Sequence, residues 1–393
     1  MSTRNRKLKI AVVGAGIGGL TAAAALTQKG FEVQVYERSD KLGEVGAGLQ
    51  MGPNAVKVIR ALGLEDAYMK TASEPENRIS LTWDTGQLRS QEQLRGVMEK
   101  TYGAAYTMSH RADLHSLLMS QVPEKNIHTG HACVDAENFE NHAVVQFSNG
   151  KEIEADIVIA SDGIHSVIRK KLFGDSKPRF SGQICWRLSV PMDDFLRVNE
   201  KSPYPFTGKE YAGWIGPTGH VLFYPIRAGE LLNIFAGRVS STWADENWAV
   251  PSATGEMMEA YAGWNETMLS VLSMATEAYK WGIHDRDPLP NLNVGHIAMM
   301  GDAAHPMMPT LAQGGAMALE DGMVIARLLN ANANDPQQAL IEYSKERQPR
   351  VSRVQLQARQ QFLNNQLHPA PPPISVGWIY GHDAVDGVDF QQS

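Results

Sequence analysis

The chain has 393 residues, of which 43% are hydrophobic and 20% charged, and its formal net charge is −7. A chain of this length and apolar content predicts about two globular domains with large cores. The negative charge argues against broad binding to nucleic acid or to an anionic membrane, and no apolar stretch is long enough and glycine-poor enough to span a bilayer.

A strand, a glycine-rich turn, a helix and a second strand are predicted at the start of the chain. They cover 10–13, 14–19, 20–28 and 31–36. The second strand ends on an acid, Glu37, about 20 residues after the turn. This order is typical of the βαβ unit that binds the ADP half of a dinucleotide. The basic first residues and the small apolar run superficially resemble a secretory signal, but the glycine spacing and the second strand favour the nucleotide unit.

Each residue type in this turn has a separate physical purpose. Gly14 permits a tight turn, Gly16 lets the backbone approach a pyrophosphate, and Gly19 lets the helix pack closely on the strand. The helix N-terminus offers free N–H groups and a positive dipole end to the phosphates. Glu37 can accept hydrogen bonds from ribose hydroxyls.

The region from 42 to 162 continues this first domain. A glycine-rich turn is expected at 42–50, helices at 53–62 and 110–121, and short strands near 78–89. Two strands, 143–147 and 153–159, flank the turn Asn149-Gly150, which is a strong hairpin signal. The apolar run 157–160 ends on Asp162-Gly163 and predicts a buried strand of the main sheet.

A second, sheet-rich domain is predicted from about 182 to 283, where aromatic residues and alternating patterns dominate. Its strands are expected at 185–190, 211–215, 221–225 and 231–238, with a helical stretch at 255–274. The main domain then resumes with a strand at 297–300, a helix from 313 past 328 and a last helix at 336–367. A proline-rich stop begins a tail whose Trp378, Ile379, Tyr380 and Phe390 suggest that it packs back onto the body.

Three predicted strand ends carry glycine or acid: Gly14 to Gly19, Asp162-Gly163 and Gly301-Asp302. Ligands of open α/β sheets lie beyond the carboxyl ends of the strands. The sequence therefore predicts one long cofactor groove that all three segments line.

These motifs, with Ala303-Ala304-His305-Pro306 and Gln313-Gly314 after the last of them, resemble the single-component FAD-dependent aromatic hydroxylases, the group A flavoprotein monooxygenases. The resemblance covers nearly the whole chain. It implies an α/β fold with a discontinuous Rossmann-like FAD-binding domain, a β-sheet-rich substrate domain and a C-terminal helix. The expected domains are 1–75, 103–180 and 288–367 for FAD, 76–102 and 181–287 for the substrate, and 368–393 for a tail packed on the body.

The resemblance also implies which residues hold FAD. Asp302 would bind a ribityl hydroxyl, and Pro306 would lie beside the flavin ring; the alternative for Asp302 is a helix N-cap. The helix that begins at Gly314-Gly315 would point its positive end at the flavin N1–C2=O edge. Arg38 is an adenine-side neighbour or a solvated charge. The full set is Gly14, Gly16, Ile17, Gly19, Glu37, Arg38, Gln50, Arg111, Cys133, Asp162, Asp302, Pro306, Gly314 and Gly315.

His220 and Tyr224 are the expected catalytic residues, because the family places a His and, four residues later, a Tyr near the substrate. On a strand this spacing puts both side chains on one face. A histidine can take a phenol proton near neutral pH, and a tyrosine can orient a carboxylate or hydroxyl. The alternative is a turn histidine and a core tyrosine.

The family resemblance implies a monooxygenase that uses NADH or NADPH, O2 and a flavin C4a-hydroperoxide to hydroxylate a hydroxylated aromatic or pyridine carboxylic acid. The subfamilies that look most similar are salicylate hydroxylase, 3-hydroxybenzoate 6-hydroxylase and 6-hydroxynicotinate 3-monooxygenase. Gln50, Pro309 and Thr310 stand where one or another of these subfamilies has a different residue, so no one substrate is predicted. An NAD(P)-dependent dehydrogenase and a non-catalytic flavin-binding protein remain alternatives.

The two cysteines, Cys133 and Cys185, are too few for a disulfide framework and fit a reducing compartment. We therefore expect a cytoplasmic protein, and separately a monomer or homodimer. No Cys/His cluster has zinc spacing, so no metal is predicted.

Overall fold

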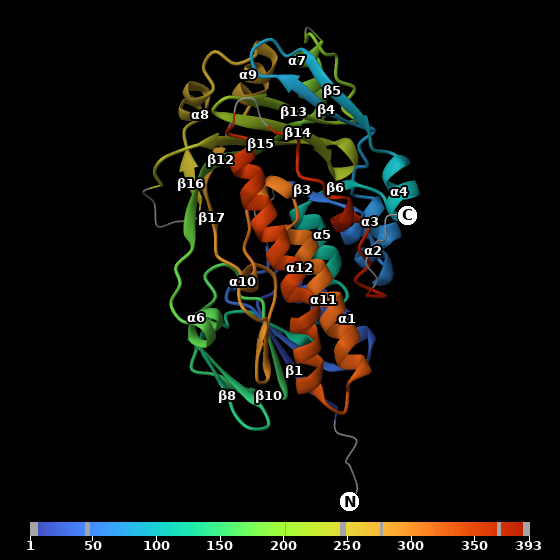
Figure 1. Ribbon diagram of the computed structural model, residues 1–393, viewed down its shortest axis with the longest axis vertical. Helices are drawn as coiled ribbons and strands as arrows, with labels where there is room; N and C mark the ends of the chain where they lie inside the picture. Colours follow the sequence, from blue (N-terminus) through green and yellow to red (C-terminus); the bar gives the residue numbers. More distant parts are fainter. Residues whose placement is uncertain are drawn as a thin grey trace, which may run out of the picture.

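Two β-sheets, one of six strands and one of eight, form the lower and upper halves of the molecule as drawn in Figure 1. This computed structural model describes residues 7–43, 48–200, 202–243, 249–275, 278–367 and 371–387. The α/β fold class predicted from the sequence is confirmed. No helix in these ranges is long and apolar enough to cross a membrane.

The six-stranded sheet has the order β18-β19-β11-β1-β2-β7 and contains the predicted βαβ unit. Its strands are β18 (Asn293–Val294), β19 (Ile297–Met299), β11 (Ile157–Ala160), β1 (Lys9–Val13), β2 (Glu32–Tyr36) and β7 (Ile127–His128). From β19 to β7 all neighbours run parallel, and only β18 is antiparallel. The central strands are apolar because both faces are covered.

Three helices cover one face of this sheet: α1 (Ile17–Gln28), α11 (Gly314–Ala331) and α12 (Pro336–Asn364) (Figure 1). Small residues bring α1 and α11 unusually close. A Cβ added at Gly18 would lie 3.1 Å from the Cβ of Ala318, and one added at Gly322 would lie 2.7 Å from the backbone nitrogen of Ala22. The alanine-rich sequence of α1 therefore serves helix packing.

The eight-stranded sheet has the order β16-β17-β12-β15-β14-β13-β4-β5. Its strands are β16 (Ala249–Ser252), β17 (Ala278–Asp285), β12 (Arg179–Pro191), β15 (Leu231–Val239), β14 (Gly219–Ile226), β13 (Glu210–Gly216), β4 (Asn77–Thr82) and β5 (Leu88–Gln93). One face carries its own aromatic core, with Trp186, Trp214 and Phe223. The other face, which includes Cys185 and Tyr224, packs on the core of the lower half.

The remaining strands form a three-stranded sheet, β10-β9-β8, and a two-stranded sheet, β3-β6. The strands are β3 (Gly48–Met51), β6 (Thr107–His110), β8 (Cys133–Asn138), β9 (Ala143–Phe147) and β10 (Glu152–Ala155). The helices are α2 (Pro53–Ala61), α3 (Glu65–Met69), α4 (Val97–Tyr102), α5 (Arg111–Met119), α6 (Val167–Phe173), α7 (Met192–Asn199), α8 (Thr254–Ala260), α9 (Glu266–Ser273), α10 (Gly301–Ala304) and α13 (Gly377–Tyr380). Short 3-10 turns lie at Glu124–Asn126, Arg227–Gly229 and Pro309–Leu311.

Two predicted elements are wrong in extent. The predicted strand 153–159 is two strands, because β10 pairs antiparallel with β9 while β11 pairs parallel with β1. Asp156 marks the change of sheet, and its carboxylate accepts a hydrogen bond from the backbone N–H of Lys9. The predicted helix 255–274 is likewise two helices, since Asn265 caps the start of α9 by accepting from the backbone N–H of Met268.

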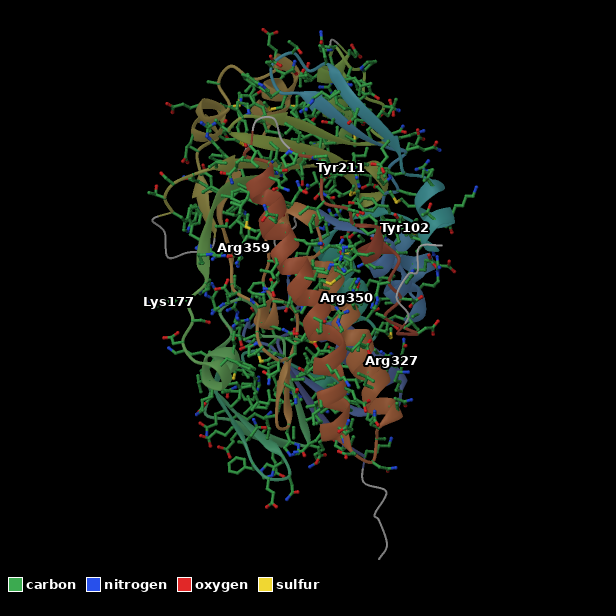
Figure 2. The ribbon with its side chains drawn as sticks, in the orientation of Figure 1. Tyr102, Lys177, Tyr211, Arg327, Arg350 and Arg359 are labelled. Atoms are coloured by element: carbon green, nitrogen blue, oxygen red, sulfur yellow. The ribbon has the colours of Figure 1, made fainter. Side chains whose placement is uncertain are left out.

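The C-terminal segment runs back against α12 and α2. Ile379 and Tyr380 are buried, and the Ile379 carbonyl accepts a hydrogen bond from Arg350 at 3.0 Å. The Arg353 guanidinium lies 3.9 Å from the centre of the Trp378 ring. Phe390 lies outside the described residues. Near the C-terminal end of α12, Arg359 pairs with Asp285 of β17 at 2.8 Å and so connects the helix to the upper sheet (Figure 2).

Candidate active site

Four neighbouring strands of the six-stranded sheet end at the same edge. Gly14 follows β1, Glu37 follows β2, Asp162 lies beyond β11, and Asp302 lies beyond β19. Because these strands are adjacent and parallel, the four segments span only about 14 Å, which is three strand spacings. The sites predicted for the diphosphate and for the ribityl arm of one dinucleotide therefore share one edge.

The geometry of the glycine turn assigns a different constraint to each glycine. Gly14 has φ +104°, and a Cβ there would lie 2.2 Å from the carbonyl oxygen of Ser161. A Cβ at Gly19 would lie 2.0 Å from the carbonyl oxygen of Gly14. Gly16 instead faces open space, with no atom within 4 Å of its added Cβ. The turn thus has one exposed backbone position, just before Ile17 begins α1.

Glu37 supports the turn directly. Its carboxylate accepts hydrogen bonds from the backbone N–H of Ala15 at 2.8 Å and of Ser39 at 3.0 Å. Its neighbour Arg38 is exposed. On the other side of the turn, the His115 Nε2 of α5 lies 2.7 Å from the Ala15 carbonyl oxygen. This contact holds α5, whose first residue is the half-buried Arg111, against the turn. The sequence interpretation missed His115, since no motif marks it.

Asp162 has two roles at once. One carboxylate oxygen accepts from the backbone N–H of Val167 at 3.0 Å at the start of α6, and the other is buried without a hydrogen-bond partner. Burial raises the pKa of Asp162. Burial and the nearby Asp162 charge also raise the pKa of the Cys133 thiol to about 12, so this half-buried cysteine stays protonated.

Asp302 is exposed at the edge, within the short helix α10. Two hydrogen bonds to buried side chains fix the loop around it. Gly301 donates its N–H to Asp321 at 3.0 Å, and the carbonyl of the buried Pro306 accepts from Gln355 at 3.1 Å. Asp302 therefore remains available to a ligand while its backbone is fixed.

Two arginines that the sequence analysis missed hold the loops next to this edge. Arg169 of α6 donates to the carbonyl of Ala303 at 3.3 Å and also to that of Ala304. Arg286 donates to the carbonyl of Ile164 at 2.8 Å. Both side chains are buried, and desolvation lowers the pKa of Arg169 to about 10. Their carbonyl partners come from distant parts of the chain, so no local pattern could reveal them.

The N-terminus of α11 points an uncapped helix end at the same region. No side chain caps its first turn, and a Cβ added at Gly314 would meet no atom within 4 Å. Gly315 is tighter, with the Met51 side chain 3.2 Å from its added Cβ. The preceding Ala312 has φ +53°, a left-handed conformation unusual for alanine. Because the N-terminal N–H groups of this 18-residue helix have no side-chain cap, the helix favours negative charge next to its N-terminus.

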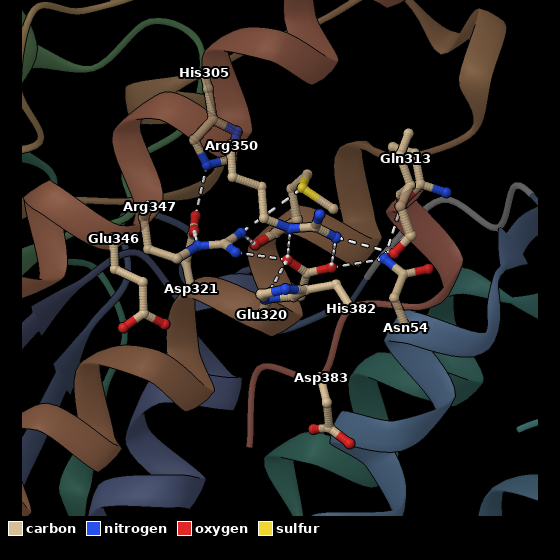
Figure 3. A network of polar contacts seen from close by, with 12 residues as sticks. Asn54, His305, Gln313, Glu320, Asp321, Glu346, Arg347, Arg350, His382 and Asp383 are labelled. Carbon is tan, nitrogen blue, oxygen red and sulfur yellow. Dashed lines mark hydrogen bonds and ion pairs between the residues drawn. The ribbon is translucent and has the colours of Figure 1, made fainter. Parts of the chain in front are cut away.

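A buried ionic network lies behind this helix end (Figure 3). Arg347 contacts Glu320 at 2.6 Å and Asp321 at 2.8 Å, and Arg350 contacts Glu320 at 2.8 Å. Asp321 also accepts from His305 at 2.5 Å. Asn54 of α2 donates to Glu320 and to Gln313, the residue before α11. The network therefore connects α2, α11, α12 and the loop that carries Asp302.

His220 and Tyr224 lie on the face of the eight-stranded sheet that packs toward the lower half. The His220 ring is partly exposed and stacks on Phe235, with ring centres 5.4 Å apart, and desolvation lowers the pKa of His220 to about 4. Tyr224 is buried against Gly48, and burial raises the pKa of its phenol. Tyr211, on the same face, meets Tyr224 edge to face at 5.9 Å (Figure 2). Gln50 accepts from Tyr106 at 2.7 Å.

The structure thus brings most of the predicted residues to the region between the two sheets. The carboxylates of Glu37 and Asp162 already accept hydrogen bonds from the protein backbone, and Arg38 is exposed to solvent. Among the described residues, no group of three or more His, Cys, Asp or Glu side chains could hold a metal ion.

Comparisons with known proteins agree along nearly the full length. Residues 7–358 match the protein family described as FAD binding domain. The chain is 36% identical over 393 residues to 3-amino-4-hydroxybenzoate 2-monooxygenase PtmB3 of Streptomyces platensis, covering 97% of each chain. It is 36% identical over 378 residues to 6-hydroxynicotinate 3-monooxygenase of Pseudomonas fluorescens, covering 95% of each. A solved salicylate hydroxylase substrate complex superposes with TM-score 0.84 at 26% identity over 97% of each chain.

Proposed function

Because this chain belongs to the FAD binding domain family and is an FAD-dependent aromatic-ring monooxygenase, we propose that it hydroxylates a hydroxylated aromatic or pyridine carboxylic acid. The observation that carries the proposal is the full-length similarity to two monooxygenases whose names specify such acids. The same similarity leaves the dehydrogenase and the non-catalytic carrier without support. We propose NADH or NADPH as the electron donor.

The residues at the sheet edge fit FAD. The open position at Gly16 and the free N–H groups of α1 suit the diphosphate, and exposed Asp302 suits the ribityl hydroxyls. The uncapped N-terminus of α11 suits the flavin edge where negative charge develops on reduction. Asp162 offers one buried oxygen without a partner. When bound, FAD supplies the redox chemistry by accepting electrons from NAD(P)H and activating dioxygen.

His220 and Tyr224 would act on the substrate. With a pKa of about 4, His220 is a neutral imidazole at pH 7, so its free nitrogen lone pair can accept a hydrogen bond from a substrate hydroxyl. Such a hydrogen bond polarises the O–H bond and makes the aromatic ring more nucleophilic. Tyr224, whose raised pKa keeps it protonated, would donate to the substrate.

The domain assignment follows from the same proposal. Residues 1–75, 103–180 and 288–367 would form the FAD-binding domain, 76–102 and 181–287 the substrate domain, and 368–393 a tail packed on the body. Location in the cytoplasm and a monomeric or homodimeric state remain predictions from the cysteine usage and the family resemblance.

The test measures NADH and NADPH oxidation by the yellow protein with 3-amino-4-hydroxybenzoate, 6-hydroxynicotinate, 3-hydroxybenzoate and salicylate, with product and peroxide both quantified. We expect at least one acid to stimulate oxidation and to appear as a hydroxylated product. If no acid yields an oxygenated product, the proposed substrate class is wrong.

His220→Ala should retain FAD and lower kcat with the active acid by about 10- to 100-fold, as loss of a hydrogen bond to a group that gains charge does. Flavin absorbance and steady-state kinetics measure both quantities. Wild-type turnover in this variant would remove His220 from the mechanism, whereas loss of FAD would mean that the residue has a structural role.

A further inference from the structure

One arginine on the substrate-facing side of the upper sheet has no assigned role. Arg187 of β12 is paired in register with Phe235 of β15, which in turn is paired with Leu222 of β14. On β14, His220 and Tyr224 lie two residues to either side of Leu222. Strand spacing and rise therefore put the Arg187 Cα about 12 Å from those of His220 and Tyr224, with all three side chains on one face. A single aromatic ring can fit between groups at that separation.

Arg187, like Arg78, lies beside two aromatic rings, but Arg78 pairs with the carboxylate of Glu92. The Arg187 guanidinium lies 5.7 Å from the centre of the Phe235 ring and 5.6 Å from that of Trp281. Its Nε is buried without a hydrogen-bond partner, and no carboxylate in the described ranges pairs with it. By contrast, Arg347 and Arg350 both contact Glu320. Arg187 is half-buried as a residue, so its buried Nε is the atom that a bound acceptor would satisfy.

Other polar atoms on this face also lack partners. Trp281 of β17 pairs with Cys185, two residues before Arg187 on the same face, and its indole Nε1 is buried without a partner. The Oε1 of Gln183, again on this face, is buried and unpaired. Native proteins satisfy nearly all such atoms, so the two unpartnered N–H donors, Arg187 Nε and Trp281 Nε1, suit a bound acceptor group, whereas the Gln183 oxygen would need a donor.

We propose that Arg187 and the indole N–H of Trp281 bind the carboxylate of the substrate, so that its hydroxyl reaches His220. The inference rests on the proposed function and adds the subsite that selects an acid. A guanidinium is the preferred protein group for carboxylates, because it can form two charge-assisted hydrogen bonds. The flanking Phe235 and Trp281 rings exclude water from the pair, which strengthens it.

Benzoate tests the subsite, because it carries the carboxylate but no hydroxyl and need not react; benzamide is its neutral counterpart. Dissociation constants for both would be measured by flavin difference absorbance on wild-type holoenzyme and on Arg187→Gln, Arg187→Lys and Trp281→Phe. Arg238→Gln is the matched control, because Arg238 lies on β15, next to β12, but on the opposite face of the same sheet. FAD content and a thermal melt show that each variant is folded.

We expect Arg187→Gln to weaken benzoate binding by about 10- to 100-fold, as loss of hydrogen bonds to a charged group does. Arg187→Lys should recover part of the loss, Trp281→Phe should weaken binding less, and Arg238→Gln should match the wild type. Benzamide binding should change little in any variant. Any of three results would overturn the proposal. These are an equal loss of affinity for benzoate and benzamide, unchanged benzoate binding in Arg187→Gln, and no benzoate binding by the wild type. These titrations need no turnover, so they remain decisive even if none of the four hydroxylated acids is oxidised.

Discussion

At the scale of single residues, neighbouring glycines in the first turn serve different purposes. Gly14 and Gly19 are required by the fold, because a methyl group at either would overlap a carbonyl oxygen. Gly16 meets nothing within the protein, so its requirement comes from the ligand. The same motif thus contains residues that determine folding and a residue that determines binding.

Gly16→Ala should therefore fold normally and bind FAD about 10- to 100-fold more weakly, since a methyl group would occupy the space next to the phosphates. Flavin content after dialysis and fluorescence titration with FAD measure the loss, and thermal unfolding of the apoprotein reports the fold. Gly255→Ala, at an open and exposed position in α8, is the control and should leave both unchanged. A Gly16→Ala apoprotein that unfolds far below the wild type would contradict this division of roles.

His220 should also contribute to the pH dependence of stability. Desolvation lowers its pKa from 6.5 to about 4, so between these values the unfolded chain takes up a proton that the folded protein does not. Stability from this group is full above about pH 6.5 and falls as the pH drops toward 4. Urea unfolding at pH 7 and pH 5 should show a smaller decrease for His220→Gln than for the wild type. An equal decrease in both proteins would mean that His220 titrates normally.

At the scale of elements, α11 and α12 are joined by ion pairs of two kinds, buried and partly exposed. Arg347 and Glu320 are fully buried, whereas Arg327 and Glu346 keep 28% and 30% of their side-chain surface. A buried pair with one partner removed leaves an uncompensated charge, while a partly exposed pair is solvated when broken. The two pairs therefore offer a direct comparison on the same helices.

Arg347→Met should lower the free energy of unfolding by about 3 to 5 kcal/mol, because Glu320 and Asp321 lose a shared buried cation. Arg327→Met, the control, should cost no more than about 1 kcal/mol. Urea denaturation followed by circular dichroism gives both values. Similar losses in the two variants would show that the buried network contributes no special stability.

At the scale of the whole molecule, one buried cluster extends across both halves, although the upper sheet also has a core of its own. Cys185, Tyr224 and Ile226 of the upper sheet belong to the same buried cluster as the strands of the lower sheet. The C-terminal segment adds Ile379 and Tyr380 to this cluster and supplies the carbonyl that accepts from Arg350. We therefore expect the two halves to unfold together rather than as independent domains.

Removal of residues 371–393 tests the contribution of the tail. The truncated chain should lose roughly 3 to 6 kcal/mol of stability, the contribution from burying the two large side chains, Ile379 and Tyr380, that it no longer has. Pro371→Ala, at an exposed position, should have almost no effect. Thermal and urea unfolding measure both. A truncated protein with wild-type stability would show that this packing is not important for the fold.

The sequence by itself determined the βαβ unit, the three motifs at the strand ends and the family, because these depend on local spacing and on glycines whose conformations few other residues adopt. Only the tertiary structure decided where β10 ends and β11 begins, because that boundary depends on which sheet each segment joins. It alone revealed Arg169, Arg286 and the unpaired Arg187, because their surroundings come from residues far away in the chain. A sequence pattern reports the periodicity of one segment, whereas burial and charge compensation are properties of the segments that meet.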